Sequence, residues 1–230
     1  MLKIGHRGAP RMAPANTMAS FRLAAERGCE WVECDCRAAK DGVIVLAHDP
    51  DVTDEKSGRG LRVDRMTAEE LALLDLGAGD GVPTLAELVA WAAESGVGVM
   101  ADVKVGGRER EIGEALRPLP NDLRIVAGAD EKGRSRFREI FPDLPLSLTV
   151  DRLNVVALRN RLTEVDTEAV TLDYPIITPA RIRALQSRGI RVFAWTVDDL
   201  RTMCRLADMG IDGIISNRPD LLAELQPANS

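Results

Sequence analysis

The sequence predicts an α/β protein, a single-domain (β/α)8 TIM barrel, from three observations. Short apolar runs rich in Val, Ile and Leu alternate with longer segments of helical periodicity, as expected where crossover helices join parallel strands. Eight such runs occur along the 230 residues, a length that suits a compact barrel. Apolar residues make up 45% of the chain, enough for a large core. Periodicity alone leaves an open, doubly wound sheet about equally compatible.

The predicted strands are short and are rich in β-branched residues. They are Leu2–Gly5, Glu30–Asp35, Gly98–Val103, Leu123–Ala127, Leu146–Val150, Ala169–Leu172, Arg191–Trp195 and Ile211–Ile215. A further strand, Val43–Ala47, follows the turn at Lys40-Asp41-Gly42. We expect this strand to pair with the end of the second run.

The predicted helices lie between these strands, and several carry start and stop signals. They are Asn16–Arg27, Ala68–Leu74, Leu85–Glu94, Arg108–Leu116, Lys132–Ile140, Arg152–Arg161, Pro179–Arg188 and Asp199–Met209. Thr67 and Thr84 each precede a glutamate by three residues, which is the spacing of a capping box. Pro179 follows Thr178 at a first helical position, and glycine follows several helix ends, where it can adopt the left-handed conformation.

No linker or change of composition divides the chain, so residues 1–230 are expected to form one domain. The segment Asp49–Arg65 is the longest without clear periodicity, and it is rich in Asp, Gly and charge. We interpret this segment as a loop over the functional site.

Charge and composition narrow the class of function. The formal net charge of −6 argues against a nucleic-acid partner, because an acidic surface repels backbone phosphates. No apolar run reaches the roughly 18 residues that a transmembrane helix needs. The first residues run directly into a strand without a signal-like apolar stretch, which predicts a cytoplasmic protein. If a leader upstream of Met1 is cleaved off, a secreted or lipid-anchored protein is the alternative.

Four cysteines are too few and too clustered to predict a disulfide framework in a chain of this length. The pair Cys34-Asp-Cys36 matches no zinc spacing, so buried and reduced thiols are expected.

Functional residues of a barrel gather where its strands end, and the polar residues of this chain are concentrated there. The two histidines of the chain, His6 and His48, both follow predicted strands. Glu33 and Asp35 lie two residues apart and therefore point to the same face of their strand. Two carboxylates at the mouth of an apolar barrel need a balancing cation, and a hard divalent ion is the simplest one.

The third predicted strand repeats this spacing with Asp102 and Lys104, and Arg7 adds a guanidinium that suits a phosphate oxygen. Each feature also has a plainer interpretation. A Glu-x-Asp pair is often an exposed edge or part of an ion pair, and Asp102 with Lys104 could form only a salt bridge. Because all these residues fall at strand ends, their combination favours phosphoryl chemistry, in which cations bind the anion while imidazoles move protons.

A series of short motifs extends over nearly the whole chain and is densest in the first 104 residues. It comprises His6-Arg7-Gly8, Pro14-Ala15-Asn16-Thr17, Phe21, Gly28, Glu33-Cys34-Asp35, Lys40-Asp41-Gly42, His48-Asp49, Thr67, Glu70-Leu71, Asp75, Pro83-Thr84-Leu85, Lys104, Trp195-Thr196 and Gly210–Ile215. In order and spacing this series resembles the glycerophosphodiester phosphodiesterase family. A pattern of many parts is far more specific than any one of its motifs.

The resemblance implies a TIM barrel of the PLC-like phosphodiesterase type. It implies cleavage of a small-molecule glycerophosphodiester to sn-glycerol 3-phosphate and an alcohol, with one divalent cation, Mg²⁺ or Ca²⁺ and possible use of Mn²⁺. By position, His6 and His48 would be the general acid and base, with Arg7 on the phosphate. In the family's favoured scheme the glycerol 2-hydroxyl attacks phosphorus, and water then opens the cyclic phosphate; direct attack by water is the alternative.

The resemblance also implies the binding residues. Glu33, Asp35 and Asp102 would hold the metal, Lys104 would neutralise phosphate charge, and Trp195 would wall the glycerol side. Considered without this resemblance, a tryptophan at the position of Trp195 more often packs inside the barrel.

Four positions depart from the family's usual pattern. Ala15 stands where a glutamate is usual, and Asp102 is one methylene shorter than the usual ligand. Ala129 replaces an aromatic residue, and Asn217 stands where an aspartate is frequent. These departures leave open a lysophospholipid, sugar or cyclic phosphodiester as substrate. A non-catalytic phosphodiester-binding protein, or a barrel isomerase or aldolase, has less in its favour.

Overall fold

A parallel barrel forms the body of the molecule. A computed structural model of the chain describes residues 1–77, 79–151 and 167–225. Within these residues eight parallel strands follow the order β7-β6-β2-β1-β11-β10-β9-β8. A parallel bridge between Val126 and Leu146 brings β7 beside β8, so the sheet closes on itself. This closure confirms the predicted (β/α)8 barrel and excludes the open, doubly wound sheet.

The strands agree closely with the predicted runs. The barrel strands are β1 (Leu2–His6), β2 (Trp31–Ala38), β6 (Gly98–Val103), β7 (Arg124–Ala127), β8 (Ser147–Val150), β9 (Ala169–Asp173), β10 (Arg191–Trp195) and β11 (Gly213–Ser216). The additional strand β3 (Ile44–Leu46) pairs antiparallel with the end of β2, as predicted.

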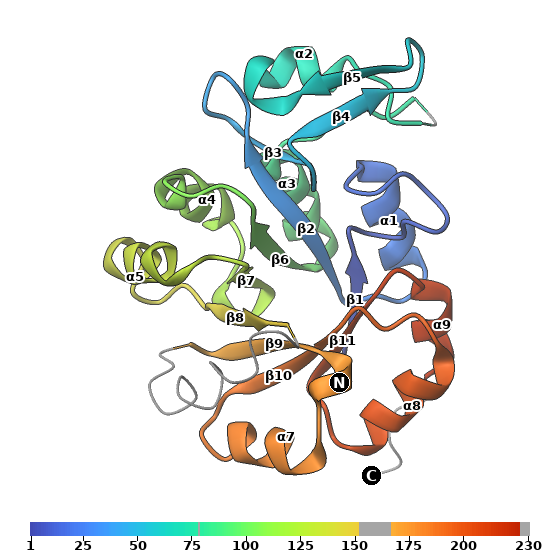
Figure 1. Ribbon diagram of the computed structural model, residues 1–230, viewed down its shortest axis with the longest axis vertical. Helices are drawn as coiled ribbons and strands as arrows, with labels where there is room; N and C mark the ends of the chain where they lie inside the picture. Colours follow the sequence, from blue (N-terminus) through green and yellow to red (C-terminus); the bar gives the residue numbers. More distant parts are fainter. Residues whose placement is uncertain (78, 152–166, 226–230) are drawn as a thin grey trace.

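Helices surround the strands (Figure 1). They are α1 (Met18–Glu26), α2 (Ala68–Ala72), α3 (Leu85–Ser95), α4 (Glu109–Leu116), α5 (Glu131–Ile140), α7 (Pro179–Gln186), α8 (Leu200–Asp208) and α9 (Pro219–Glu224). The capping boxes predicted at Thr67 and Thr84 are both present, and Pro179 is the first residue of α7 after its cap Thr178. Gly96 ends α3 in the left-handed conformation at φ 69°. The predicted helix Arg152–Arg161 lies outside the described residues, and α9 was not predicted.

Two cores use opposite faces of the strands, because side chains alternate along a strand. Inside the barrel, Ile4, Trp31, Met100 and Phe193 pack together. The outer core lies between strands and helices and includes Val32, Cys34 and Cys36, which lie on the opposite face of β2 from Trp31. The cysteines in the described residues are free; Cys29, Cys34 and Cys36 are buried, and Cys204 is exposed.

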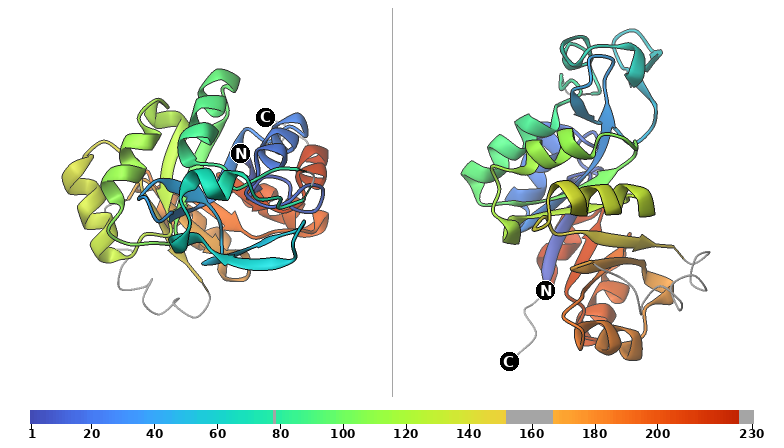
Figure 2. Two further views of the ribbon diagram at one scale, coloured as in Figure 1. Left: turned by 90° about the horizontal axis from the view of Figure 1, so that it is seen from above. Right: turned by 90° about the vertical axis from the view of Figure 1, so that its left-hand side faces the viewer.

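The prediction of a loop over Asp49–Arg65 was wrong. Strands β4 (Asp51–Asp54) and β5 (Arg59–Arg62) form an antiparallel hairpin there, followed by a short 3-10 helix at Val63–Arg65. Most hairpin side chains are exposed, so the apolar alternation that identifies a strand is absent. The hairpin and α2 form a group that projects from one end of the barrel (Figures 1 and 2).

None of the helices in the described part of the chain is long and apolar enough to cross a bilayer.

Candidate active site

A cavity of about 540 Å³ lies at the mouth of the barrel, where the parallel strands end. Seven of the eight predicted site residues line it: His6, Arg7, Glu33, His48, Asp102, Lys104 and Trp195. The eighth, Asp35, is fully buried beside them. The fold therefore brings together every side chain that the sequence singled out, and the strand register explains how.

The end of β1 supplies an imidazole and a guanidinium. Pairing of β1 with β2 sets His6 beside Glu33, and Nε2 of His6 lies 3.8 Å from Oε2 of Glu33. Arg7 follows in the left-handed conformation at φ 54°, which is uncommon for a residue with a side chain. In this conformation the Arg7 N–H donates to Oε2 of Glu33 at 3.0 Å, and its Nε lies 2.9 Å from Oδ2 of Asp35.

The three acids come from neighbouring strands. Asp35 of β2 lies directly opposite Asp102 of β6 in the parallel register. Glu33, Asp35 and Asp102 each have a carboxylate oxygen within 4.8 Å of the others. Oxygen ligands lie about 2.0–2.6 Å from Mg²⁺ or Ca²⁺, so oxygens at this spacing can share one ion. This acidic cluster could therefore hold a divalent cation.

Cationic side chains compensate the acidic cluster unevenly. The ammonium of Lys104 contacts Asp102 directly and lies 3.1 Å from Oδ1 of Asp35, so the plain salt bridge considered from the sequence does form. Burial would raise the pKa of Asp35, but Lys104, a hydrogen bond from Asn16 and Arg7 together hold it below its ordinary value.

Glu33 has no lysine or arginine side chain in salt-bridge contact among the described residues. Burial, followed by the charges of Asp35 and Asp102, raises the pKa of Glu33 well above its ordinary value. A buried carboxylate without a compensating charge is costly, and a bound cation is the usual remedy. The donor set and its deficit of positive charge thus fit a divalent ion.

Sequence reasoning noted Asn16 only as part of a motif, yet this residue holds the acidic cluster in place. Its Nδ2 donates to Oδ2 of Asp35 at 2.8 Å, and its Oδ1 accepts from the Asp35 backbone N–H at 3.1 Å. Asn16 is only 3% exposed and adopts the left-handed conformation at φ 59°. The only signal in the sequence was the asparagine before a helix cap, which is too common to identify a supporting residue.

His48 lies at the rim of the cavity, with 41% of its side chain exposed. Its Nδ1 lies 2.9 Å from Oδ1 of Asp49. Arg37 of β2 donates from Nε and Nη2 to the His48 carbonyl oxygen, at 2.9 and 2.7 Å. This fork fixes the backbone that carries the imidazole, and no pattern in the sequence indicated it.

His6 is the more enclosed of the two histidines. Its Nδ1 lies 2.7 Å from Oδ1 of Asn217, the residue that directly follows β11. Burial lowers the pKa of His6 to about 4, although the contact with Asn217 partly opposes the shift. The imidazole is therefore neutral at pH 7 and can accept a proton.

Trp195 ends β10 and forms part of the opposite wall of the cavity. Its indole N–H is buried and has no hydrogen-bond partner in the described part of the chain. Thr149 and Thr171 line the cavity as well, together with Ala127 at the end of β7 and Gly128 directly after it. This side of the cavity therefore offers hydroxyl groups and the unpaired indole N–H.

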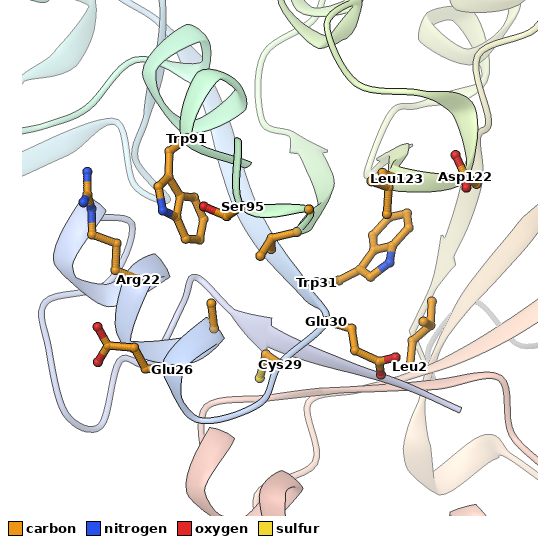
Figure 3. A pocket seen from close by; sticks show the side chains of 13 residues that line it. Leu2, Arg22, Glu26, Cys29, Glu30, Trp31, Trp91, Ser95, Asp122 and Leu123 are labelled. Atoms are coloured by element: carbon orange, nitrogen blue, oxygen red, sulfur yellow. The ribbon is translucent and has the colours of Figure 1, made fainter. Parts of the chain in front are cut away.

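A second cavity lies at the other end of the strands, between α1, α3 and the start of β2 (Figure 3). Trp91, Trp31 and Cys29 form its apolar part, and Arg22 and Glu26 of α1 lie along one side (Figure 3). Barrel enzymes carry their chemistry at the opposite face, and this cavity contains neither histidine of the chain. The mouth of the barrel is the better candidate for an active site.

Fold and site together define a (β/α)8-barrel protein that gathers imidazoles, acids and cationic side chains where its strands end. The Glycerophosphoryl diester phosphodiesterase family matches residues 6–221, and the chain belongs to this family. The protein is accordingly a phosphoric diester hydrolase.

Individual relatives match over almost their whole length. YhdW of Bacillus subtilis is 32% identical over 237 residues, which cover 96% of each chain. The Glycerophosphodiester phosphodiesterase of Caldanaerobacter subterraneus subsp. tengcongensis is 29% identical over 97% of each chain. A phosphodiesterase structure from Oleispira antarctica, in complex with the product sn-glycerol-3-phosphate, superimposes with a TM-score of 0.84 at 25% identity. That comparison covers 96% of this chain and 94% of the other.

Proposed function

We propose that this protein hydrolyses glycerophosphodiesters to sn-glycerol 3-phosphate and an alcohol, with His6 and His48 moving the protons. The observation that carries the proposal is the meeting of both imidazoles with Arg7, Lys104 and the acidic cluster around one cavity. The product bound to the Oleispira antarctica relative supports the same substrate class.

Glu33, Asp35 and Asp102 would hold one divalent cation, Mg²⁺ or Ca²⁺, with Mn²⁺ as a further possibility. Their all-oxygen donor set suits a hard ion, and the uncompensated charge of Glu33 supports its presence. When bound, such an ion neutralises phosphate charge and acts as a Lewis acid.

The side chains of the chain divide the remaining work. Arg7 and Lys104 would bind the non-bridging phosphate oxygens, since both reach the cavity as cations. His6, neutral because of its burial, would accept the proton of the attacking hydroxyl group as the new P–O bond forms. His48 would give a proton to the leaving alcohol as the old P–O bond breaks, and its exposure at the rim lets solvent restore that proton. Where the attacking group is the glycerol 2-hydroxyl, water would then open the cyclic phosphate with the two histidine roles exchanged, which releases glycerol 3-phosphate.

Trp195 would contact the glycerol part of the substrate from the opposite wall. A glycerol hydroxyl could accept from the free indole N–H, because a buried donor without a partner loses free energy that a ligand can restore. Ala127 and Gly128 also line the cavity, and the small size of these residues leaves room for the alcohol group on that side.

The first test measures release of glycerol 3-phosphate from glycerophosphocholine and glycerophosphoethanolamine, and release of choline from lysophosphatidylcholine as the competing substrate. Each assay is run with Mg²⁺, Ca²⁺, Mn²⁺ or a chelator. We expect turnover of the first two substrates and its loss after chelation. Full activity without metal, or preference for lysophosphatidylcholine, would contradict the proposal.

The second test removes each imidazole in turn. His6→Ala and His48→Ala should each lower kcat by about 10²- to 10⁴-fold, the usual cost of a lost proton-transfer group. Circular dichroism and the melting temperature show whether each variant still folds. A folded His48→Ala protein with the wild-type rate would remove that residue from the mechanism.

A further inference from the structure

Two loops at the mouth of the barrel meet behind His6. Asp198 lies three residues after the end of β10, and Asn217 directly follows β11. The register pairs Gly5 of β1 with Ser216 of β11, which brings Asn217 next to His6. A backbone hydrogen bond from the Val197 N–H to the Ile215 carbonyl oxygen, at 3.0 Å, holds the first loop against β11.

Asp198 accepts every hydrogen bond that it makes in this arrangement. Its Oδ1 accepts from the hydroxyl of Ser216 at 3.1 Å and from the Asn217 backbone N–H at 2.8 Å. Its Oδ2 accepts from Nδ2 of Asn217 at 2.7 Å. An ionised carboxylate has no proton to donate, so the amide of Asn217 must turn its NH₂ group toward Asp198.

This orientation leaves the Oδ1 of Asn217 facing His6. A carbonyl oxygen only accepts hydrogen bonds, so the His6 nitrogen 2.7 Å away must carry a proton. We propose that Asp198 and Asn217 form a positioning relay that holds neutral His6 as the tautomer protonated at Nδ1. The lone pair then lies on Nε2, the nitrogen that faces Glu33 and the acidic cluster at 3.8 Å.

The relay gives Asp198 and Asn217 a positioning role, although neither residue takes part in proton transfer to or from the substrate. The tautomer itself depends only on these hydrogen bonds, whereas its value to turnover rests on the proposed function of His6. The free nitrogen of a histidine is set by the hydrogen bond at the other nitrogen. With the relay, the proton acceptor points into the cavity before substrate arrives. Asn217 is thus a positioning residue in this protein, although aspartate is more usual at this position in the family.

Replacing Asp198 with asparagine gives a sharp test, because it should reverse the relay. The introduced amide would present an NH₂ group to Asn217, whose own amide would have to turn over. The NH₂ group of Asn217 would then face Nδ1 of His6, which would become an acceptor. We expect Asp198→Asn to move the His6 proton from Nδ1 to Nε2.

The tautomer can be read by ¹⁵N NMR of the imidazoles at about pH 8, where histidine is neutral. The chain contains only two histidines, so His48→Ala assigns the spectrum. If Asp198→Asn does not fold, Asn217→Ala removes the acceptor and should also lower the Nδ1–H population. A wild-type protein that carries the His6 proton on Nε2 would overturn the proposal.

The exchange of both residues should restore the relay. In Asp198→Asn/Asn217→Asp, the new carboxylate accepts from the amide introduced at position 198 and from Nδ1–H of His6, so the original tautomer returns. We expect kcat of Asp198→Asn to fall about 10- to 100-fold, as for other groups that orient a reactive ligand. The kcat of the double variant should recover to within about fivefold of wild type, which corresponds to less than roughly 1 kcal/mol in activation free energy.

Asp199→Asn is the matched control. It makes the same chemical change at the next residue, which caps α8 through a bond from Thr202 N–H at 2.8 Å. Asparagine caps equally well, so both tautomer and kcat should stay as in wild type. A double variant no better than Asp198→Asn would refute the relay. If the wild type lacks glycerophosphodiesterase activity, the proposed function fails, and NMR still decides the tautomer.

Discussion

The acidic cluster depends on one side chain that takes no part in the chemistry. Asn16 satisfies both a carboxylate oxygen and the backbone N–H of Asp35, and it does so from the left-handed region of backbone space. Asparagine tolerates that conformation better than most residues, since its short polar side chain can bond locally. The position therefore needs both the amide and the backbone freedom.

Two substitutions at Asn16 separate these requirements. Asn16→Ala leaves buried polar groups of Asp35 unpaired and strains the backbone, so unfolding free energy should fall by about 2–4 kcal/mol. Asn16→Gly also removes the amide but relieves the strain, and it should be more stable than Asn16→Ala by about 1 kcal/mol. Both should weaken divalent-ion binding about 10- to 100-fold. Denaturant titration measures the unfolding free energy, and calorimetry measures the affinity for the divalent ion. Equal stability of the two variants would contradict the role given to the left-handed backbone conformation at position 16.

At the scale of elements, the contact between α4 and α5 depends on a glycine inside a helix. Gly113 lies in the middle of α4, and a Cβ built there would lie 2.1 Å from the ring of Phe141 at the end of α5. Glycine weakens a helix by about 1 kcal/mol relative to alanine. This cost is accepted because the aromatic ring occupies the space of the missing methyl group.

Gly113→Ala sets helix propensity against packing. The gain of about 1 kcal/mol in propensity should be outweighed by overpacking, which costs about 1–3 kcal/mol, so the variant should be less stable. Gly133 in α5 is the comparison, because a Cβ there would meet the capping oxygen Oδ1 of Asp130 at 3.2 Å, which is a tight contact but no clash with a ring. Gly133→Ala should therefore lose much less stability than Gly113→Ala. Urea unfolding of both variants tests this, and stabilisation by Gly113→Ala would contradict it.

Elements with strong local signals were predicted well. Capping boxes at Thr67 and Thr84 are short-range, so the residues within one turn decide them. The hairpin β4–β5 has no such signal, because its two strands stabilise each other mainly through the backbone ladder of Asp51–Arg62. Helix α9 is only six residues long, which is too short for periodicity to identify.

At the scale of the whole molecule, closure of the barrel concentrates negative charge in its mouth. Glu33 holds its proton more tightly in the folded protein than in an unfolded chain, because burial and the neighbouring acids raise its pKa. Such a group favours the fold below its ordinary pKa of 4.5, and this contribution is lost as pH rises through the higher folded value. Metal-free protein should therefore lose stability from this source as pH rises.

Glu33→Gln tests this linkage. In the presence of a chelator, the melting temperature of the variant relative to wild type should increase between about pH 4 and pH 8, since glutamine cannot ionise. Saturating Ca²⁺ or Mg²⁺ should raise the melting temperature of wild type by mass action and that of the variant much less. If the difference in melting temperature between the two proteins does not change with pH, the ionisation of Glu33 does not destabilise the fold.

The candidate site was predictable to a large extent because its residues stand at strand ends. Once eight strands close a barrel, His6, Glu33, Asp35, Asp102 and Lys104 must share one rim. The supporting contacts were not predictable. Asn16, Arg37 and Asp198 act through bonds to residues that are between 11 and 19 positions away. No pattern in sequence spacing marks such partners.

The sequence by itself determined the order of the barrel strands, the capping boxes and the candidate site residues, since local preferences and alternation are short-range properties of the chain. Only the tertiary structure decided that the sheet closes at Val126 and Leu146, that Glu33 has no cationic side chain in contact with it among the described residues, and that Asn217 turns its carbonyl toward His6. These facts depend on distances between segments far apart in the chain, and folding alone sets such distances.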